Sequence, residues 1–370
     1  MKAADFHFEF PKELIAVEAL RTRSEARLLV CDRSQASVQH SNFSRLPGFL
    51  QSGDVLIVNE STILPARFLA KRKTGGTLEG LYLQATTERG VQVWLKGRAD
   101  EGELIELFGN GEWVKVLARN EKEAELEIEA SAFRSYLKQF GRIPVPPYIR
   151  SERLERGLPA ETQCDTEDYQ TVFAKLDRAA SKEKDRMESF SVASPTASLH
   201  FDEALMESLE ARGVRVLRIN LCVGLGTFAP LPLHEELDEC VLHEEAVEID
   251  SKTWLEILDA KRKGHRMVAV GTTVLRAVEA AHRREQEGLP SQQFRTNLFV
   301  KPPFQFGIVD SLITNFHWPE SSLLILIATF LEAKDGYCST RLEHRWRSIY
   351  QQAVAEKYRL FSYGDGMLIV

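Results

Sequence analysis

The chain has 370 residues, of which 44% are hydrophobic and 27% are charged, and its formal net charge at pH 7 is −7. This length allows two domains, and this composition is that of a globular protein with a buried core. The acidic balance argues against a nonspecific nucleic-acid binder, because such proteins are normally basic. No run approaches the ~20 apolar residues of a membrane helix, and no basic and apolar leader opens the chain. We therefore expect a cytoplasmic protein that has no membrane partner.

The cysteines indicate neither a zinc site nor a disulfide framework. All five lie far apart, and no pair has CxxC spacing: Cys31, Cys164, Cys222, Cys240 and Cys338. Reduced structural thiols are the interpretation that this spacing favours. No histidine and carboxylate triple has the spacing of metal ligands either, so we expect no catalytic metal.

In chain order, the first sixty residues predict two buried strands, over 27–31 and 54–59. From about residue 77 to residue 130, short apolar runs alternate with Gly, Asn and Asp turns, which is typical of a small β-barrel or sandwich. Three prolines at 144–147 then indicate a stiff connection back to the main body. We expect a compact β-domain over 66–149, inserted into a larger domain that comprises 1–65 and 150–370.

The segment after this insertion begins with a charged stretch and continues as α/β. Residues 175–190 carry many charges and few large apolar side chains, which predicts a solvated helix or a mobile loop. Beyond it, helices alternate with strands. The expected helices span 202–212, 254–263, 273–284 and a segment from 320 onward, and the expected strands span 214–223, 267–270 and 308–313.

Three polar loops follow these strands directly, at 224–228, 271–273 and 314–319. Ligands of α/β sheets bind at the carboxyl ends of strands, so the three loops would line one rim if the strands are parallel neighbours. A fourth polar loop at 195–200 precedes the helix that we expect from 202. We expect the active site of a soluble enzyme where these four loops meet.

Two of these loops contain glycines with a chemical use. Gly271-Thr272-Thr273 opens a helix, whose free amides attract a carboxylate, and Arg276 lies one turn further on. An ordinary helix cap with a surface arginine fits this string equally well. Gly224 and Gly226 partly match a dinucleotide fingerprint, but the prolines at 230 and 232 exclude the helix that such a motif requires. The two glycines instead allow the backbone to approach a ligand closely.

Three histidines are candidates for acid–base chemistry, although each fits a packed or exposed structural histidine at least as well. His200 ends the first loop, and His317 lies between Phe316 and Trp318. His243 would share a strand face with Glu245. On the basic side, three arginine or lysine clusters stand out against the acidic background, and their ordinary interpretation is a solvated surface. They lie at 21–27, at 67–73 and at 142–156.

Taken together, these strings resemble one family, the S-adenosylmethionine:tRNA ribosyltransferase-isomerases of queuosine biosynthesis. The resemblance extends over nearly the whole chain, and about ten strings occur in the order of the family. Besides the four loops, they are Pro11–Ala16, Arg23 with Arg27–Val30, Gly53-Asp54, Val58–Thr62 with Pro65-Ala66-Arg67, Thr74–Gly76, Pro144–Ile149, Asp168–Ala174 and Phe361–Asp365.

The resemblance implies a particular reaction and fold. Enzymes of this family transfer and isomerise the ribosyl part of S-adenosylmethionine onto 7-aminomethyl-7-deazaguanine in tRNA. Epoxyqueuosine-tRNA forms, and adenine and methionine are released. S-adenosylmethionine is thus a substrate, no other cofactor is expected, and tRNA carrying the deazaguanine precursor is the partner of an enzyme expected to act as a monomer. The implied fold is a large mixed-sheet α/β domain with an inserted small β-barrel domain.

The resemblance also assigns expected roles to residues. Acid–base catalysis would fall to His200, His243, Glu245 and His317. Substrate binding would involve Thr196, Ala197, Gly224, Gly226, Thr227, Phe228, Gly271, Thr272, Thr273, Arg276, Asn315 and Phe316. Within that set, Thr272, Thr273 and Arg276 would hold the methionine carboxylate, and Phe228, Phe316 or the neighbouring Trp318 would stack on a base. The tRNA phosphates would contact Arg67, Lys71, Arg72 and Lys73.

The chain departs from the family pattern close to the expected pocket. Ser198 replaces a common glycine, Pro302-Pro303-Phe304 replaces Pro-Gly-Tyr, and His243-Glu244-Glu245 replaces a His-Ser-Glu pattern. The stretch 175–190 also looks longer than usual. Two other functions therefore stay open at this point. One is a diverged homologue that acts on another acceptor, and the other is a tRNA-binding protein without catalysis.

Overall fold

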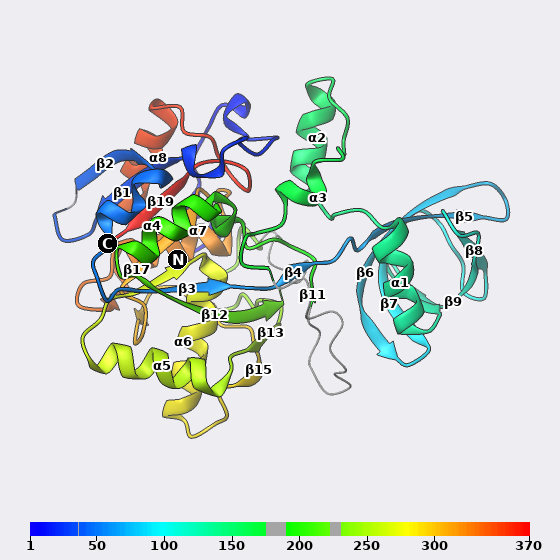
Figure 1. Ribbon diagram of the computed structural model, residues 1–370. Coiled ribbons are helices and arrows are strands. Elements are labelled where there is room, and N and C mark those ends of the chain that lie inside the picture. The colour runs from blue at the N-terminus through cyan, green and yellow to red at the C-terminus, as the bar shows by residue number, and fades with distance from the viewer. Residues whose placement is uncertain (36, 175–189, 223–230) are drawn as a thin grey trace.

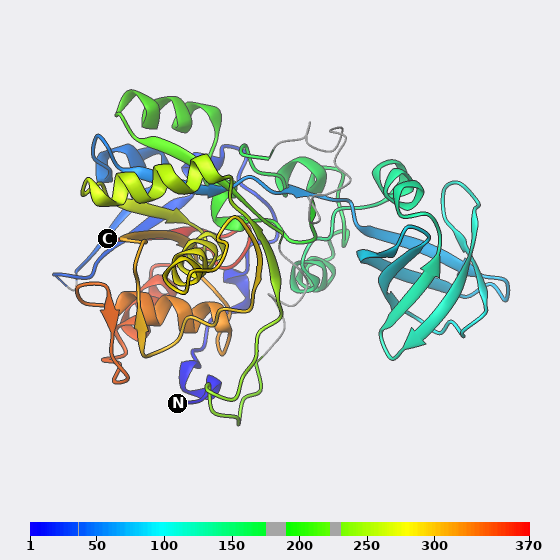
Figure 2. The same cartoon turned by 90° about the horizontal axis from the view of Figure 1, so that it is seen from below.

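The computed structural model describes residues 1–35, 37–174, 190–222 and 231–370. A large α/β body and a smaller barrel stand side by side, joined by extended segments (Figures 1 and 2). This arrangement confirms the predicted fold class, a large mixed-sheet α/β domain with an inserted small β-barrel. No helix in the described ranges combines the length and the apolar character needed to cross a membrane.

The body is organised around a nine-stranded mixed sheet with the order β15-β13-β12-β3-β14-β17-β19-β1-β2. In that order the strands are Gln293–Thr296, Glu245–Glu248, Arg215–Cys222, Val55–Asn59, Met267–Val270, Ser311–Asn315, Gly366–Ile369, Arg27–Asp32 and Ser37–Asn42. The four strands from β12 to β17 run parallel, with β3 between β12 and β14. The carboxyl ends of β12, β14 and β17 therefore lie at one edge of the sheet, as the loop argument requires.

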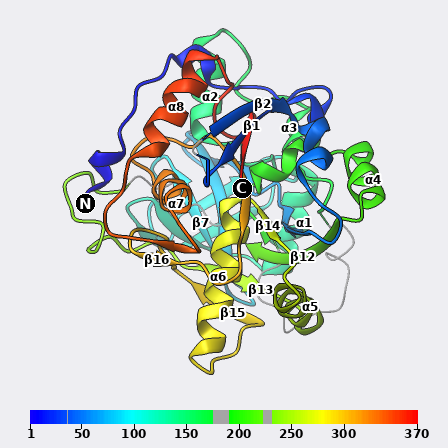
Figure 3. The same ribbon diagram turned by 90° about the vertical axis from the view of Figure 1, so that its left-hand side faces the viewer.

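Both faces of this sheet are covered, and its central strands are buried along their whole length. All residues of β3 and β14 are buried. Ile57 and Ala269 face a core that includes residues of α6, α7 and α8. Leu56 and Val268 face the opposite core, which includes residues of α4. Figure 3 shows α7 and α8 on one side of the sheet and α4 on the other.

Three helices of the body begin at a polar side-chain cap, and α6 begins at Gly271. The helices of the body are α2 (Pro147–Glu155), α3 (Asp165–Asp168), α4 (Glu203–Ala211), α5 (Ser251–Arg262), α6 (Thr272–Gln286), α7 (Ser322–Leu331) and α8 (Arg345–Ala355). The side chains of Asp202, Asp250 and Ser321 accept backbone N–H groups at the starts of α4, α5 and α7. Two short strand pairs, β4 (Thr62–Ile63) with β11 (Phe190–Ser191) and β16 (Phe304–Gln305) with β18 (Tyr337–Cys338), complete this part.

The inserted unit is a closed antiparallel barrel with the order β10-β7-β6-β5-β8-β9. Its strands are Glu123–Glu127, Gly90–Lys96, Thr77–Thr87, Arg67–Arg72, Leu104–Leu107 and Trp113–Asn120. Helix α1 (Ala130–Phe140) packs on the barrel, and its Phe133 ring meets Phe68 edge-on at 5.2 Å. Gly80 leaves room for the Phe68 ring, since a Cβ there would lie 2.1 Å from it. The division at 66–149 stays our proposal for the domain boundary.

The strand expected at 308–313 begins three residues later, and the reason is local. The carboxylate of Glu279 accepts the backbone N–H groups of Gly307, Ile308 and Val309 at 2.8–3.0 Å. These amides are therefore used before β17 begins. At its other end β17 extends to Asn315, which pairs with Gly366 of β19 and which the sequence placed in a loop. The charged stretch of 175–190 lies, except for its last residue, outside the described residues.

Candidate active site

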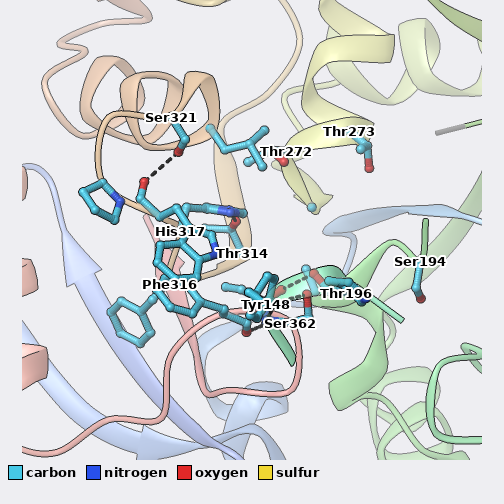
Figure 4. Close-up of a pocket in the computed structure, with 18 of the residues that line it drawn as sticks. Tyr148, Ser194, Thr196, Thr272, Thr273, Thr314, Phe316, His317, Ser321 and Ser362 are labelled. Carbon is cyan, nitrogen blue, oxygen red and sulfur yellow. Dashed lines mark hydrogen bonds between the residues drawn. The ribbon is translucent and has the colours of Figure 1, made fainter. Parts of the chain in front are cut away.

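A cavity of about 410 Å³ opens at the carboxyl ends of β14 and β17. Its walls come from three of the four polar loops and from two segments that the sequence did not single out as a site, near Tyr148 and near Phe361 (Figure 4). The lining residues are 146–148, 194–197, 231, 233, 271–273, 314–321, 323, 361 and 362. The predicted convergence of the loops at one rim is therefore observed for the first, third and fourth loops.

One wall is the start of α6. Gly271 caps this helix with a backbone φ of 98°, and no side chain caps the first turn. Thr272 and Thr273 line the cavity there. The hydroxyls of Thr273 and Ser194 are buried and have no hydrogen-bond partner among the described residues. Free helix amides beside unused hydroxyl donors form a site that suits an anion such as a carboxylate.

The floor of the cavity includes Thr196 and Asn315, and Asn315 is the centre of a hydrogen-bonded network. Its Oδ1 accepts from the Thr196 hydroxyl at 2.9 Å, and its Nδ2 donates to the carbonyl of Phe361 at 3.2 Å. The same Nδ2 lies 3.1 Å from Nε2 of His200. An amide nitrogen only donates, so His200 accepts through Nε2 and is neutral. These hydrogen bonds fix the amide of Asn315 in the cavity floor.

His200 itself does not line the cavity, in contrast to its expected catalytic role. It is 4% exposed, and its ring stacks on Phe43 with centroids 4.2 Å apart. Burial, helped by the positive charges of Arg359 and Arg23, lowers the pKa of His200 to about 3. His200 therefore lies behind Asn315 and is linked to the cavity through that side chain.

Of the four predicted catalytic residues, His317 is the one that lines the cavity. Its Nε2 lies 3.0 Å from the Thr314 hydroxyl, and its backbone N–H donates to the Tyr350 hydroxyl at 3.1 Å. Burial lowers the pKa of His317 to about 3, so its imidazole is neutral near pH 7. A neutral imidazole accepts a proton and does not repel a cationic substrate.

His243 and Glu245 do not share a strand face, which corrects the sequence expectation. Strand β13 begins only at Glu245, and His243 precedes it as an exposed residue. The Glu245 carboxylate is buried and accepts from Nη1 of Arg276 at 2.6 Å. Nε of Arg276 donates to the carbonyl of Leu298 at 2.9 Å. None of these side chains lines the cavity; Arg276 links α6 to β13, and its Nη2 has no hydrogen-bond partner among the described residues.

The opposite wall is aromatic. The rings of Trp318 and Phe361 stack at 4.0 Å and 9°, and Tyr148 meets both rings edge-on. Tyr148 donates to the Ser362 hydroxyl at 2.6 Å and accepts the Ser362 N–H at 3.0 Å. Burial raises the pKa of Tyr148 to about 12, so its hydroxyl stays protonated. Phe316, expected to stack on a base, is fully buried between Tyr350 and Tyr358. Of the three residues predicted to stack, Trp318 is the one that stays available within the described part of the chain.

Comparison with known proteins identifies the family. The family model described as queuosine biosynthesis protein matches residues 3–369. Proteins called S-adenosylmethionine:tRNA ribosyltransferase-isomerase in Desulforamulus reducens and Acinetobacter baumannii are each 36% identical, and the alignments cover 100% of this chain and 100% and 99% of those proteins. The chain belongs to the queuosine biosynthesis protein family.

A solved structure agrees with this assignment. The crystal structure of S-adenosylmethionine tRNA ribosyltransferase from Thermotoga maritima matches 99% of this chain and 100% of its own, with a TM-score of 0.52 and 26% identity. The sequence alignment with the Thermotoga maritima protein gives 36% identity over 384 residues.

In this member of the queuosine biosynthesis family, two of the four predicted tRNA-binding cations are already paired. Arg67 is buried against Glu79, and Arg72 binds Glu103 through two nitrogens at 2.6 and 2.8 Å. Lys71 and Lys73 are exposed on the barrel. Lys73 lies 5.6 Å from the ring centroid of the exposed Trp113. The exposed lysines are the ones available to a phosphate backbone.

Four predicted substrate-binding residues, Gly224, Gly226, Thr227 and Phe228, lie outside the described residues. The described ranges contain no group of three or more His, Cys, Asp or Glu side chains arranged to hold a metal ion. Sequence reasoning missed Ser194, Glu320 and Phe361 as cavity residues, and it named Tyr148 only within a family string. The strings Pro144–Ile149 and Phe361–Asp365 were the available signal, although nothing in them indicated where they would lie.

Proposed function

We propose that this chain is an S-adenosylmethionine:tRNA ribosyltransferase-isomerase of queuosine biosynthesis. It transfers and isomerises the ribosyl part of S-adenosylmethionine onto 7-aminomethyl-7-deazaguanine in tRNA, which gives epoxyqueuosine-tRNA, adenine and methionine. Membership of the family over residues 3–369 supports this function. The observation that carries it is a single cavity with an anion-binding helix start on one side and an aromatic wall on the other.

This cavity suits the parts of the donor. The methionine carboxylate would meet the first amides of α6 and the hydroxyls of Thr273 and Ser194. Adenine or the acceptor base would stack on Trp318. The floor of Thr196, Ala197 and Asn315 would contact the ribose. Gly224, Gly226, Thr227 and Phe228 stay in the proposed substrate-binding set, and Arg276 enters it only through its hold on α6.

The chemistry requires a proton acceptor beside the ribose. The sulfonium acidifies the neighbouring ribose carbon, and a base must take that proton before adenine leaves. His317 is our proposed base, because among the described residues it is the one histidine that lines the cavity. The Thr314 hydroxyl at 3.0 Å from Nε2 orients the ring. His200 is proposed to act indirectly, by keeping Asn315 in place.

We further propose that the enzyme works in the cytoplasm as a monomer, that it needs no cofactor besides its substrate, and that Lys71 and Lys73 contact tRNA phosphates. One chain supplies every wall of the cavity that the structure describes, which is compatible with a monomer. Light scattering during gel filtration tests the oligomeric state, and activity after dialysis against a chelator tests the cofactor requirement.

Adenine release tests the function directly. The protein is incubated with S-adenosylmethionine and tRNA bearing 7-aminomethyl-7-deazaguanine, and the same tRNA with unmodified guanine is the control. Adenine release together with a matching mass gain on the modified tRNA is the expected result. Adenine release with another acceptor alone would indicate the diverged homologue, and tRNA binding without turnover would indicate a non-catalytic binder.

A further inference from the structure

Glu320 is the one carboxylate among the described residues that line the cavity. Two other ionisable side chains line it, Tyr148 and His317, and burial keeps both neutral near pH 7 by raising the pKa of the first to about 12 and lowering that of the second to about 3. The cavity wall therefore carries a single negative charge, at Glu320. A lone carboxylate in a largely apolar wall attracts a cation.

The backbone holds Glu320 in a fixed and costly conformation. Its φ is 59°, in the left-handed region that side chains with a Cβ rarely adopt. Its N–H donates to the carbonyl of Phe6 at 3.1 Å. The carbonyl of Trp318 accepts a hydrogen bond from the Ser321 hydroxyl at 2.7 Å, and the Ser321 side chain caps α7 (Figure 4). Strained residues of this kind cluster at ligand sites, because surrounding contacts hold them against the strain.

The carboxylate of Glu320 keeps room for a ligand. Its Oε1 lies 3.0 Å from Nδ1 of His7, and among the described residues His7 is its one hydrogen-bond or ion-pair partner. The side chain of His7 is 56% exposed and that of Glu320 is 28% exposed, so the pair lies at the solvent side of the cavity. A carboxylate has about four acceptor positions, and the histidine uses one of them.

We propose that Glu320 binds a primary ammonium group of the substrate, with His7 holding the carboxylate from its solvent side. This inference rests on the proposed function, which supplies two candidate ammonium groups. One is the α-ammonium of the methionine part of the donor, and the other is the aminomethyl group of the acceptor base. The donor is favoured, because its ammonium stays charged throughout the reaction, whereas the acceptor amine must be neutral to attack.

Steady-state kinetics of Glu320→Gln with both substrates tests this proposal. Glutamine keeps the size and the hydrogen-bonding oxygen but removes the charge. We expect the KM for S-adenosylmethionine to rise about tenfold to a hundredfold, the usual loss for a charge-assisted hydrogen bond, while the KM for tRNA stays unchanged. A rise confined to the KM for tRNA would assign the site to the acceptor ammonium. Unchanged values of both would overturn the proposal.

Two controls separate charge from folding and from the reaction itself. Asp335 is another acidic residue with a left-handed backbone, at φ 50°, and it lies on the surface outside the cavity. Asp335→Asn should leave both KM values unchanged. A donor analogue without the α-amino group should bind wild type and Glu320→Gln equally in calorimetry, and a preference of the wild type for this analogue would contradict the donor assignment. If wild-type protein releases no adenine, the proposed function fails; if it is active and Glu320→Gln matches it, only this inference fails.

Discussion

The cavity of the α/β body and the outer surface of the barrel differ in whether their polar side chains already have partners, although these residues look alike in the sequence. In the body, Thr273 and Ser194 line the cavity from separate loops, and their hydroxyls have no hydrogen-bond partner among the described residues. On the barrel, Arg67 and Arg72 already bind glutamates, and only the lysines beside them stay free for a partner. A polar residue is available to a ligand only when no distant residue satisfies it first, and that depends on the fold.

The largest expected effect is on the rate of adenine release, and it distinguishes two histidines of the body. His317→Ala should lower the rate of adenine release by about 10²- to 10⁴-fold, the usual contribution of a general base. His200→Ala should cost less, about tenfold, because it acts through Asn315. Single-turnover adenine release measures both. His344→Asn, at the surface start of α8, is the control. Equal losses for the two histidine variants would contradict their different assignments.

The next prediction compares how much an ion pair of the body and an ion pair of the barrel contribute to the free energy of unfolding. Arg276→Met leaves the buried Glu245 without this partner and should lower the free energy of unfolding by about 3–5 kcal/mol. Replacing both residues, as Arg276→Met with Glu245→Leu, should recover part of that loss. Arg72→Met breaks a half-buried pair on the barrel and should lower the urea midpoint less than Arg276→Met does. Similar midpoints for Arg276→Met and Arg72→Met would show that burial does not separate the two pairs.

The pH dependence of stability tests whether His200 is neutral and buried in the folded protein. Its folded-state pKa of about 3 lies below the ordinary value of 6.5, so the unfolded chain takes up the proton first as the pH falls. Stability is therefore complete above pH 6.5 and is lost towards pH 3, by about 1 kcal/mol per pH unit for this group. His200→Gln should show a shallower loss in urea titrations between pH 7 and pH 4. An identical slope would contradict a neutral, buried His200.

The smallest effect concerns the barrel lysines. Lys71→Ala and Lys73→Ala should each weaken tRNA binding a few-fold and reduce the slope of log K against log salt by about 1. Arg72→Ala should change this slope less, because its guanidinium already binds Glu103. Filter binding over a range of salt concentrations measures all three. A larger slope change for Arg72→Ala than for the lysine variants would reverse the distinction.

Most of the fold could be predicted from apolar periodicity and turn residues. Strand β14 was expected at 267–270 and is observed there, and α4 begins one residue after the expected start, at its Asp202 cap. One barrel strand was harder to see. In the sequence, strand β5 looks like a basic cluster, because half of its side chains are charged. Only two apolar residues of this strand, Phe68 and Ala70, are buried in the barrel core. Closure of the barrel depends on pairings that no local pattern contains.

The loops that form the site could be predicted from the sequence, but the contacts that each of their side chains makes could not. Gly271 to Thr273 end a strand and open a helix, which local rules predict. The pairing of Arg276 with Glu245 and the place of His200 behind Asn315 depend on contacts between residues 31 and 115 positions apart. Glu320 has no motif that marks it, and its position follows from a left-handed turn before α7. Ser198, where the chain leaves the family pattern, is buried and does not line the cavity.

A crystal structure with bound S-adenosylmethionine tests most directly whether this cavity is the donor site. The account predicts the methionine carboxylate within hydrogen-bond distance of the Thr272 and Thr273 amides and of the hydroxyls of Thr273 and Ser194. It also predicts an aromatic contact with Trp318. A donor bound elsewhere, or bound with its carboxylate away from the start of α6, would contradict it.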